Sequence, residues 1–100
     1  MKLCHVTEEI SFPETFELFC APSTVQSGTV RTFENYILIE SSGRFKRFPV
    51  GTEHIKILEG NGHIKWKRGD LPFTAGDTVL AEGLSEYDFY GTGRFLVLKD

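Results

Sequence analysis

Apolar and polar residues alternate in short runs along most of the chain, a pattern typical of β-strands that bury one face. The clearest case is residues 53–66, where two alternating runs flank the dipeptide Asn61-Gly62. Asn-Gly accepts the positive φ angles of a two-residue turn, so this segment predicts a β-hairpin with its loop at Gly60-Asn61 or Asn61-Gly62. Either loop turns the same five side chains toward a core: Glu53, Ile55, Ile57, Ile64 and Trp66.

The opposite face of the predicted hairpin is basic and is expected to face water, with Leu58 as an apolar exception. Its basic side chains are His54, Lys56, His63, Lys65 and Lys67. Lys56 is expected to lie close to Lys65 or Lys67 across the hairpin, where facing like charges cost stability. We therefore expect acidic groups beside this face, such as those of a partner subunit.

The other predicted strands are shorter, and turn-forming residues separate them. They span residues 14–20, 29–34, 36–40, 44–49, 71–74, 78–81, 86–90 and 94–99. In the first of these, the alternation places Phe16, Leu18 and Cys20 on one face of the strand. A helix is the alternative prediction for this segment. Residues 36–40 are nearly all apolar, as expected of a strand covered on both faces. Turns are expected at residues 67–70 and 91–93.

No segment shows the amphipathic period of a helix over a useful length. Short strands with regularly spaced turn residues are typical of an all-β sandwich or barrel. A length of 100 residues suits one hydrophobic core. We expect residues 1–100 to form a single small barrel, with residues 1–13 as a leader or edge strand.

Composition and charge exclude several classes of protein. A net charge of -3 without a basic stripe argues against nucleic-acid binding. No apolar run approaches the ~20 residues of a membrane helix, and the polar N-terminus does not match a signal peptide. Cys4 and Cys20 belong to no metal-binding motif, so we expect two reduced, buried thiols and a cytoplasmic protein.

Two segments carry glycine and acidic positions that resemble the motifs of the cupin superfamily. Glu53 and Gly60, followed by Gly62, match the first motif, and the Gly76-Asp77 step within FTAGDTV matches the second. The resemblance covers residues 28–99. Among cupins, the chain is most similar to the small C-terminal barrel of type I mannose-6-phosphate isomerases. The resemblance implies an all-β jelly roll, also described as a double-stranded β-helix barrel.

The metal ligands of the cupins are mostly missing from the matching positions. Glu53 stands at the carboxylate position, and the late histidine position falls on Tyr87. The paired histidines fall on Lys46 and Phe48, or on Arg47 and Pro49. Cationic Lys and Arg have no lone pair to offer a metal. We therefore expect neither a metal nor another cofactor, as in the isomerase barrel that the chain resembles.

An inward carboxylate at residue 53 needs a cation, for which Arg47 and Lys46 are the nearest candidates. The simplest interpretation is an internal ion pair that fills the slot where other cupins hold a metal. The functional hypothesis is a ligand site at the barrel mouth, formed by Arg47, Glu53, Trp66 and Tyr87. There Arg47 would bind an anion, Glu53 would accept hydroxyl groups, and the two rings would supply apolar walls.

Our functional prediction is a stand-alone cupin that binds a small polar ligand, sugar-like or anionic. One alternative is a structural or oligomerisation module with a filled barrel. Another is a metal-free sugar isomerase or epimerase with Glu53 as base and Tyr87 as acid. The sequence favours a binding protein over an enzyme, since no catalytic motif is present. Because cupins commonly dimerise, a homodimer is expected.

Overall fold

The computed structural model describes residues 1–8 and 10–100, and in this part of the chain it contains strands and no helix. The strands are β1 (Lys2–His5), β2 (Ser23–Val25), β3 (Gly28–Phe33), β4 (Tyr36–Ser42), β5 (Phe45–Arg47), β6 (Glu53–Trp66), β7 (Gly69–Thr74), β8 (Thr78–Glu82) and β9 (Tyr87–Lys99). The all-β prediction is confirmed. Among the described residues, no helix is long and apolar enough to cross a membrane.

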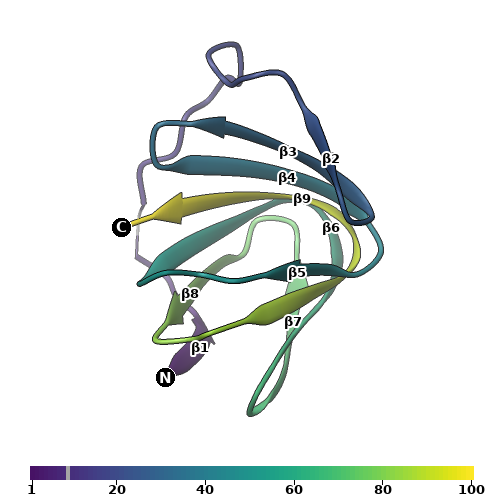
Figure 1. Cartoon of the computed structure of the whole chain (residues 1–100). Helices are drawn as coiled ribbons and strands as arrows, with labels where there is room; N and C mark the ends of the chain where they lie inside the picture. Colours follow the sequence, from purple (N-terminus) through teal and green to yellow (C-terminus); the bar gives the residue numbers. More distant parts are fainter. Residues whose placement is uncertain (9) are drawn as a thin grey trace.

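Two long strands, β6 and β9, run through both layers of the structure. Their outer segments belong to an antiparallel sheet of order β1-β8-β6-β9-β4-β3-β2. Their other segments pair with β7 and β5 and form a second, smaller layer. Figure 1 shows both strands curving round one side of the molecule as they pass between the layers. The inner faces of the layers enclose one core, which makes a jelly-roll barrel.

The predicted hairpin within residues 53–66 is wrong, because β6 is one continuous strand. Asn61 and Gly62 pair with β9 on one side and with β7 on the other. Gly60 has a φ of 92°, and a Cβ atom built there would lie 1.9 Å from the Thr92 carbonyl oxygen. The glycines therefore allow two strands to approach closely where they bend, and they do not form a turn. The turn expected at residues 91–93 is wrong for the same reason, since β9 continues through it.

The face predicted for β6 is nevertheless confirmed. Ile55, Ile57 and Ile64 are all fully buried in the same core cluster. A register shift between Ile57 and Glu59 inserts one residue into the strand, which moves the inward positions from odd to even numbers. A two-residue turn would have had the same effect on the alternation.

The expected approach of Lys56 to Lys65 or Lys67 is wrong, because it depended on the hairpin. Lys56 lies opposite Thr78 of β8 and Leu96 of β9. The turn that does form occupies residues 67–68, between β6 and β7.

Residues 14–20 form neither the predicted strand nor a helix. Leu18 is 74% exposed, whereas Phe19 is buried against Leu38 and Leu96 on the outer face of the larger sheet. We refer to residues 6–8 and 10–20 as the N-terminal strap. Its aromatic side chains cover that outer face, so β4 is enclosed on both sides, as its apolar run predicts. Cys20 on the strap is exposed, which contradicts the expectation of a buried thiol.

We predict that Gly60→Ala destabilises the protein by about 2–4 kcal/mol, because the new methyl group would overlap the backbone of β9. Gly43→Ala is the matched control: a Cβ at Gly43 would meet Ser27 at ordinary contact distances of 3.6 and 3.7 Å. The control should change stability by no more than about 1 kcal/mol. Urea unfolding followed by circular dichroism measures both. Equal stabilities of the two variants would contradict the close-approach role of Gly60.

Candidate functional site

Three of the four predicted site residues meet inside the barrel. β5 supplies Arg47, the first residue of β6 is Glu53, and β9 begins at Tyr87, which pairs with Arg47 in the sheet. Arg47 donates from Nε to Glu53 Oε1 at 3.1 Å and from Nη2 to Glu53 Oε2. The hydroxyl of Tyr87 donates to Glu53 Oε1 at 2.7 Å. We refer to these three side chains as the inner ion-pair cluster.

Burial makes this cluster a closed electrostatic unit. Glu53 and Tyr87 are each 1% exposed. Burial, followed by the charge of the Glu53 carboxylate and its hydrogen bond, raises the pKa of the Tyr87 phenol well above its usual value. Burial alone would lower the pKa of Arg47, but the hydrogen bonds and charge of Glu53 outweigh it and raise that pKa. A bidentate guanidinium and a neutral phenol therefore stabilise the buried carboxylate.

The arrangement leaves the Glu53 carboxylate little capacity for other chemistry. Its two oxygens together accept three hydrogen bonds from Arg47 and Tyr87. A general base needs an accessible lone pair directed at its substrate. The geometry therefore matches the interpretation of an internal ion pair, and it gives no support to an acid–base pair formed by Glu53 and Tyr87.

The residues at this position do not fit a metal ion. The guanidinium of Arg47 pairs with both carboxylate oxygens, and Lys46 turns away to Glu86 at 3.6 Å. His54 and His63 lie on the outer face of β6. His54 contacts Glu8, and His63 stacks on Tyr90. Among residues 1–8 and 10–100, no three His, Cys, Asp or Glu side chains group as a metal site would require.

Trp66, the fourth predicted site residue, lies apart from Arg47 and Glu53. It lines a depression of about 290 Å³ that it shares with Tyr87. The other residues of this depression are Met1, Lys65, Lys67, Leu84, Ser85, Glu86 and Asp88. We refer to it as the Trp66 depression. Tyr87 is the link between the two groups, because its ring lines the depression and its hydroxyl binds Glu53.

The two lysines of the Trp66 depression form no ion pair in the described part of the chain. Neither Lys65 nor Lys67 has a carboxylate within 4.0 Å in the described part of the chain, whereas Glu86 pairs with Lys46 and Asp88 pairs with Arg44. The sequence did not indicate Met1 or Leu84 as lining residues. They reach the depression from the chain terminus and a loop, and no strand alternation could place them.

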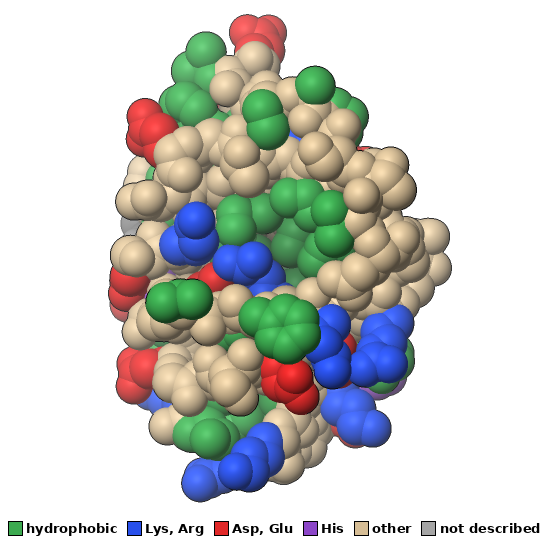
Figure 2. All heavy atoms as spheres, viewed as in Figure 1, with side chains coloured by type: hydrophobic (Ala, Val, Ile, Leu, Met, Phe, Trp, Pro, Cys, Tyr) green, Lys and Arg blue, Asp and Glu red, His purple; other side chains and the backbone are tan. Residues whose placement is uncertain are grey.

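Open apolar surface also lies near the inner ion-pair cluster. Figure 2 shows a hollow with a hydrophobic floor on the face that carries β5, with Lys, Arg and acidic side chains beside it. Phe48 and Val50, in the loop between β5 and β6, are 64% and 93% exposed. Apolar surface on this face of the molecule is therefore accessible.

Comparison with known proteins identifies similar structures but no matching sequence. No protein-family model and no curated protein sequence matches the chain. Mannose 6-phosphate isomerase from Bacillus subtilis matches in structure with a TM-score of 0.66 and 15% identity. The match covers 77% of this chain and 27% of the isomerase.

Mannose 6-phosphate isomerase from Salmonella typhimurium, whose structure holds f6p as substrate and zinc, matches with a TM-score of 0.62 and 14% identity. The match covers 80% of this chain and 22% of that enzyme. The chain thus spans about a quarter of the length of each isomerase. The predicted resemblance is confirmed at the level of structure: this chain has the cupin-like jelly-roll fold found in part of mannose 6-phosphate isomerase.

Proposed function

We propose that the chain is a cupin-like binding module that holds a small polar ligand, sugar-like or anionic, in the Trp66 depression. The observation that supports this proposal is the juxtaposition of Trp66 and Tyr87 with Lys65 and Lys67 around one depression. Aromatic rings supply apolar faces for a sugar ring, and lysines supply donors for hydroxyl or anionic oxygens. The volume of about 290 Å³ lies near the lower end of the range for small-molecule sites.

In this proposal Arg47 and Glu53 do not touch the ligand, which differs from the roles expected from the sequence. Their hydrogen bonds are directed at each other and at Tyr87. They act as positioning residues, because the hydrogen bond to Glu53 holds the phenol of Tyr87 at the wall of the depression. The isomerases of similar fold act on a sugar phosphate, which is compatible with this ligand class. At 14–15% identity, however, the similarity is evidence for the fold alone.

We predict that sugar phosphates change the fluorescence of Trp66, the single tryptophan of the chain, in a saturable way at millimolar concentration. The Lys65→Met/Lys67→Met variant should bind about tenfold more weakly, because a charge-assisted hydrogen bond is lost. Lys56→Met, which lies outside the depression, is the control. If a panel of sugar phosphates and neutral sugars gives no response, the proposal is wrong.

The structural module remains a second candidate, and one observation favours it. The strap covers the outer face of the larger sheet, whereas no described segment covers the outer face of the smaller layer. We refer to this second surface, formed by β5, β7 and the adjoining parts of β6 and β9, as the bare face. Strand register sets a row of alternating charge across this bare face: Lys46, Asp88, Lys65 and Asp70. A two-fold axis parallel to the strands would bring Lys46 opposite Asp70 and Asp88 opposite Lys65 of a second copy. The row is therefore self-complementary, as an isologous dimer requires.

Sedimentation equilibrium tests this candidate. If the bare face forms a homodimer, the dimer should weaken as salt rises, because Lys65 and Asp70 are exposed charges. Asp70→Lys should also weaken it, whereas Glu34→Lys, on the turn between β3 and β4, should not. A monomer at all concentrations would remove this candidate and leave the ligand proposal untouched.

We predict that Arg47→Met destabilises the protein by about 3–5 kcal/mol, because it leaves the Glu53 carboxylate buried without its cation. The all-apolar variant Arg47→Met/Glu53→Leu/Tyr87→Phe should recover at least half of that loss, since apolar groups can replace a buried ion pair. Chemical unfolding measures both. Additive losses from the three substitutions would contradict the description of the cluster as one closed unit.

Alkaline pH should also act through Tyr87. The pKa of its phenol is raised in the folded protein, above the value near 10 of an unfolded tyrosine. The stability that this group contributes is therefore complete below about pH 10 and is lost as the pH rises through the folded-state pKa. We predict that stability falls less steeply above pH 10 in Tyr87→Phe than in the wild type. Urea unfolding between about pH 8 and pH 11.5 checks this, and identical slopes would contradict it.

A further inference from the structure

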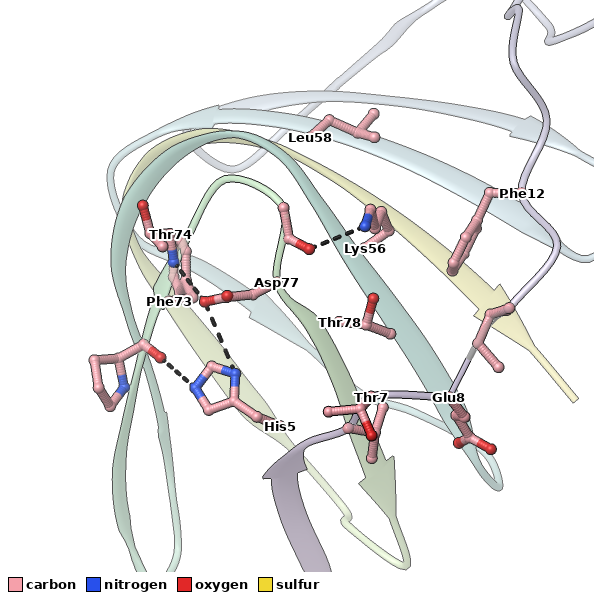
Figure 3. Close-up of a pocket in the computed structure, with 14 residues that line it drawn as sticks. His5, Thr7, Glu8, Phe12, Lys56, Leu58, Phe73, Thr74, Asp77 and Thr78 are labelled. Carbon is pink, nitrogen blue, oxygen red and sulfur yellow. Dashed lines mark hydrogen bonds and ion pairs between the residues drawn. The ribbon is translucent and has the colours of Figure 1, made fainter.

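A second hollow lies outside the barrel and shares no residue with the Trp66 depression. It has a volume of about 1010 Å³ and lies between the N-terminal strap and the outer side of β6, β7 and β8. We refer to it as the strap pocket. Figure 3 shows side chains from the strap and from these strands pointing into a common space.

The walls of the strap pocket differ in character from one end to the other. Phe12 and Ile10 of the strap, together with Leu58 of β6, form an apolar wall. His5, Thr74 and Asp77 lie together on the other side, and Lys56 lies between them and the apolar wall in Figure 3. This arrangement suits a ligand with one polar end and one apolar end.

The acidic side chains of the pocket already face basic partners. Asp77 Oδ2 accepts the backbone N–H of Thr74 at 2.8 Å and lies 3.8 Å from His5 Nδ1. Glu8 Oε1 lies 3.1 Å from His54 Nε2. The carboxylates of the described lining residues are therefore engaged within the protein.

Lys56 has no such partner among residues 1–8 and 10–100. Its Nζ donates to the carbonyl oxygen of Gly76 at 2.9 Å, and no carboxylate of residues 1–8 or 10–100 lies within 4.0 Å of it. An ammonium group has three donors, so two of them remain for a ligand. Lys56 is therefore the group in the pocket that can pair with an anion.

The backbone holds Lys56 in position before any ligand arrives. Its neighbour Ile57 donates to the Asp77 carbonyl at 2.9 Å and accepts from Gly76 N–H at 2.8 Å. These two bonds fix the turn whose carbonyl orients the ammonium group. At the strap side, His5 donates from Nε2 to the Pro72 carbonyl at 2.8 Å. A prearranged side chain loses little conformational freedom when it binds a ligand.

We propose that the strap pocket binds a small amphipathic carboxylate, with its anionic head on Lys56 and its apolar tail against Phe12 and Leu58. The site is independent of the function proposed for the Trp66 depression. It uses the outer face of the sheet and the strap, whereas that function uses the barrel mouth. Failure of one proposal therefore leaves the other standing.

Calorimetric titration with octanoate tests the proposal, with 1-octanol as the uncharged probe of equal chain length. The wild type should bind one octanoate with roughly millimolar affinity or better and should bind octanol much more weakly. Lys56→Met should weaken octanoate binding by about tenfold or more. Lys99→Met, which removes the same charge from an exposed position outside both pockets, should bind octanoate as the wild type does.

A second variant separates ligand contact from loss of folding. Phe12→Ala shortens the apolar wall and should weaken octanoate more than acetate, whereas Lys56→Met should weaken both. Circular dichroism of each variant verifies that it is folded. Absence of saturable octanoate binding to the wild type up to about 10 mM would overturn the proposal. Equal affinity of folded Lys56→Met and wild type would also overturn it, as would equal binding of octanol and octanoate.

Discussion

The carboxylate of Glu53 is buried inside the barrel, and its charge must be paired there. Moving such a charge out of water costs several kcal/mol, and only a well-oriented partner offsets that cost. Arg47 and Tyr87 supply the partner from two other strands, so one cluster ties β5, β6 and β9 together. In this chain a guanidinium supplies the positive charge.

The cluster can form because two strands bend from one layer into the other. β6 carries Glu53 at its start, in the larger sheet, and ends beside β7 in the smaller layer. β9 follows the opposite course, from Tyr87 beside β5 to the centre of the larger sheet. Glycines stand at the bend of both strands, where a side chain would overlap the neighbouring backbone. The two layers then enclose the aromatic core and bring the three strands of the cluster together.

Much of the fold was predictable because strand alternation depends on burial, which the residue types report directly. The inward face of β6 was identified correctly even though its local structure was not. Asn61-Gly62 has the strongest hairpin composition in the chain, but composition cannot distinguish a turn from a close crossing of two strands. The strand predicted within the strap was wrong because its phenylalanines pack on Leu38 and Leu96 from a loop, with no regular alternation.

The candidate sites were predictable to different degrees, for physical reasons. Arg47, Glu53 and Tyr87 occupy positions that the cupin motif spacing brings together, so their cluster was accessible from sequence. Trp66 shares a face with Glu53, but β6 bends between them, and a linear pattern does not show that separation. The strap pocket was not accessible at all. Its lining comes from the ends of several elements and from a loop, so no single stretch of sequence carries its signal.

The fold of this chain is similar to part of an isomerase whose structure contains zinc. The side chains at residues 47, 53 and 87, however, bond to one another and do not form the ligand set of a metal site. Because Arg47 pairs with both carboxylate oxygens, Glu53 is expected to hold no metal ion. Elemental analysis of protein purified without chelator, for the wild type and for Glu53→Gln, tests this expectation most directly. Both proteins should contain far less than one equivalent of zinc, iron, manganese or nickel. One equivalent of metal in the wild type that is lost in Glu53→Gln would contradict it.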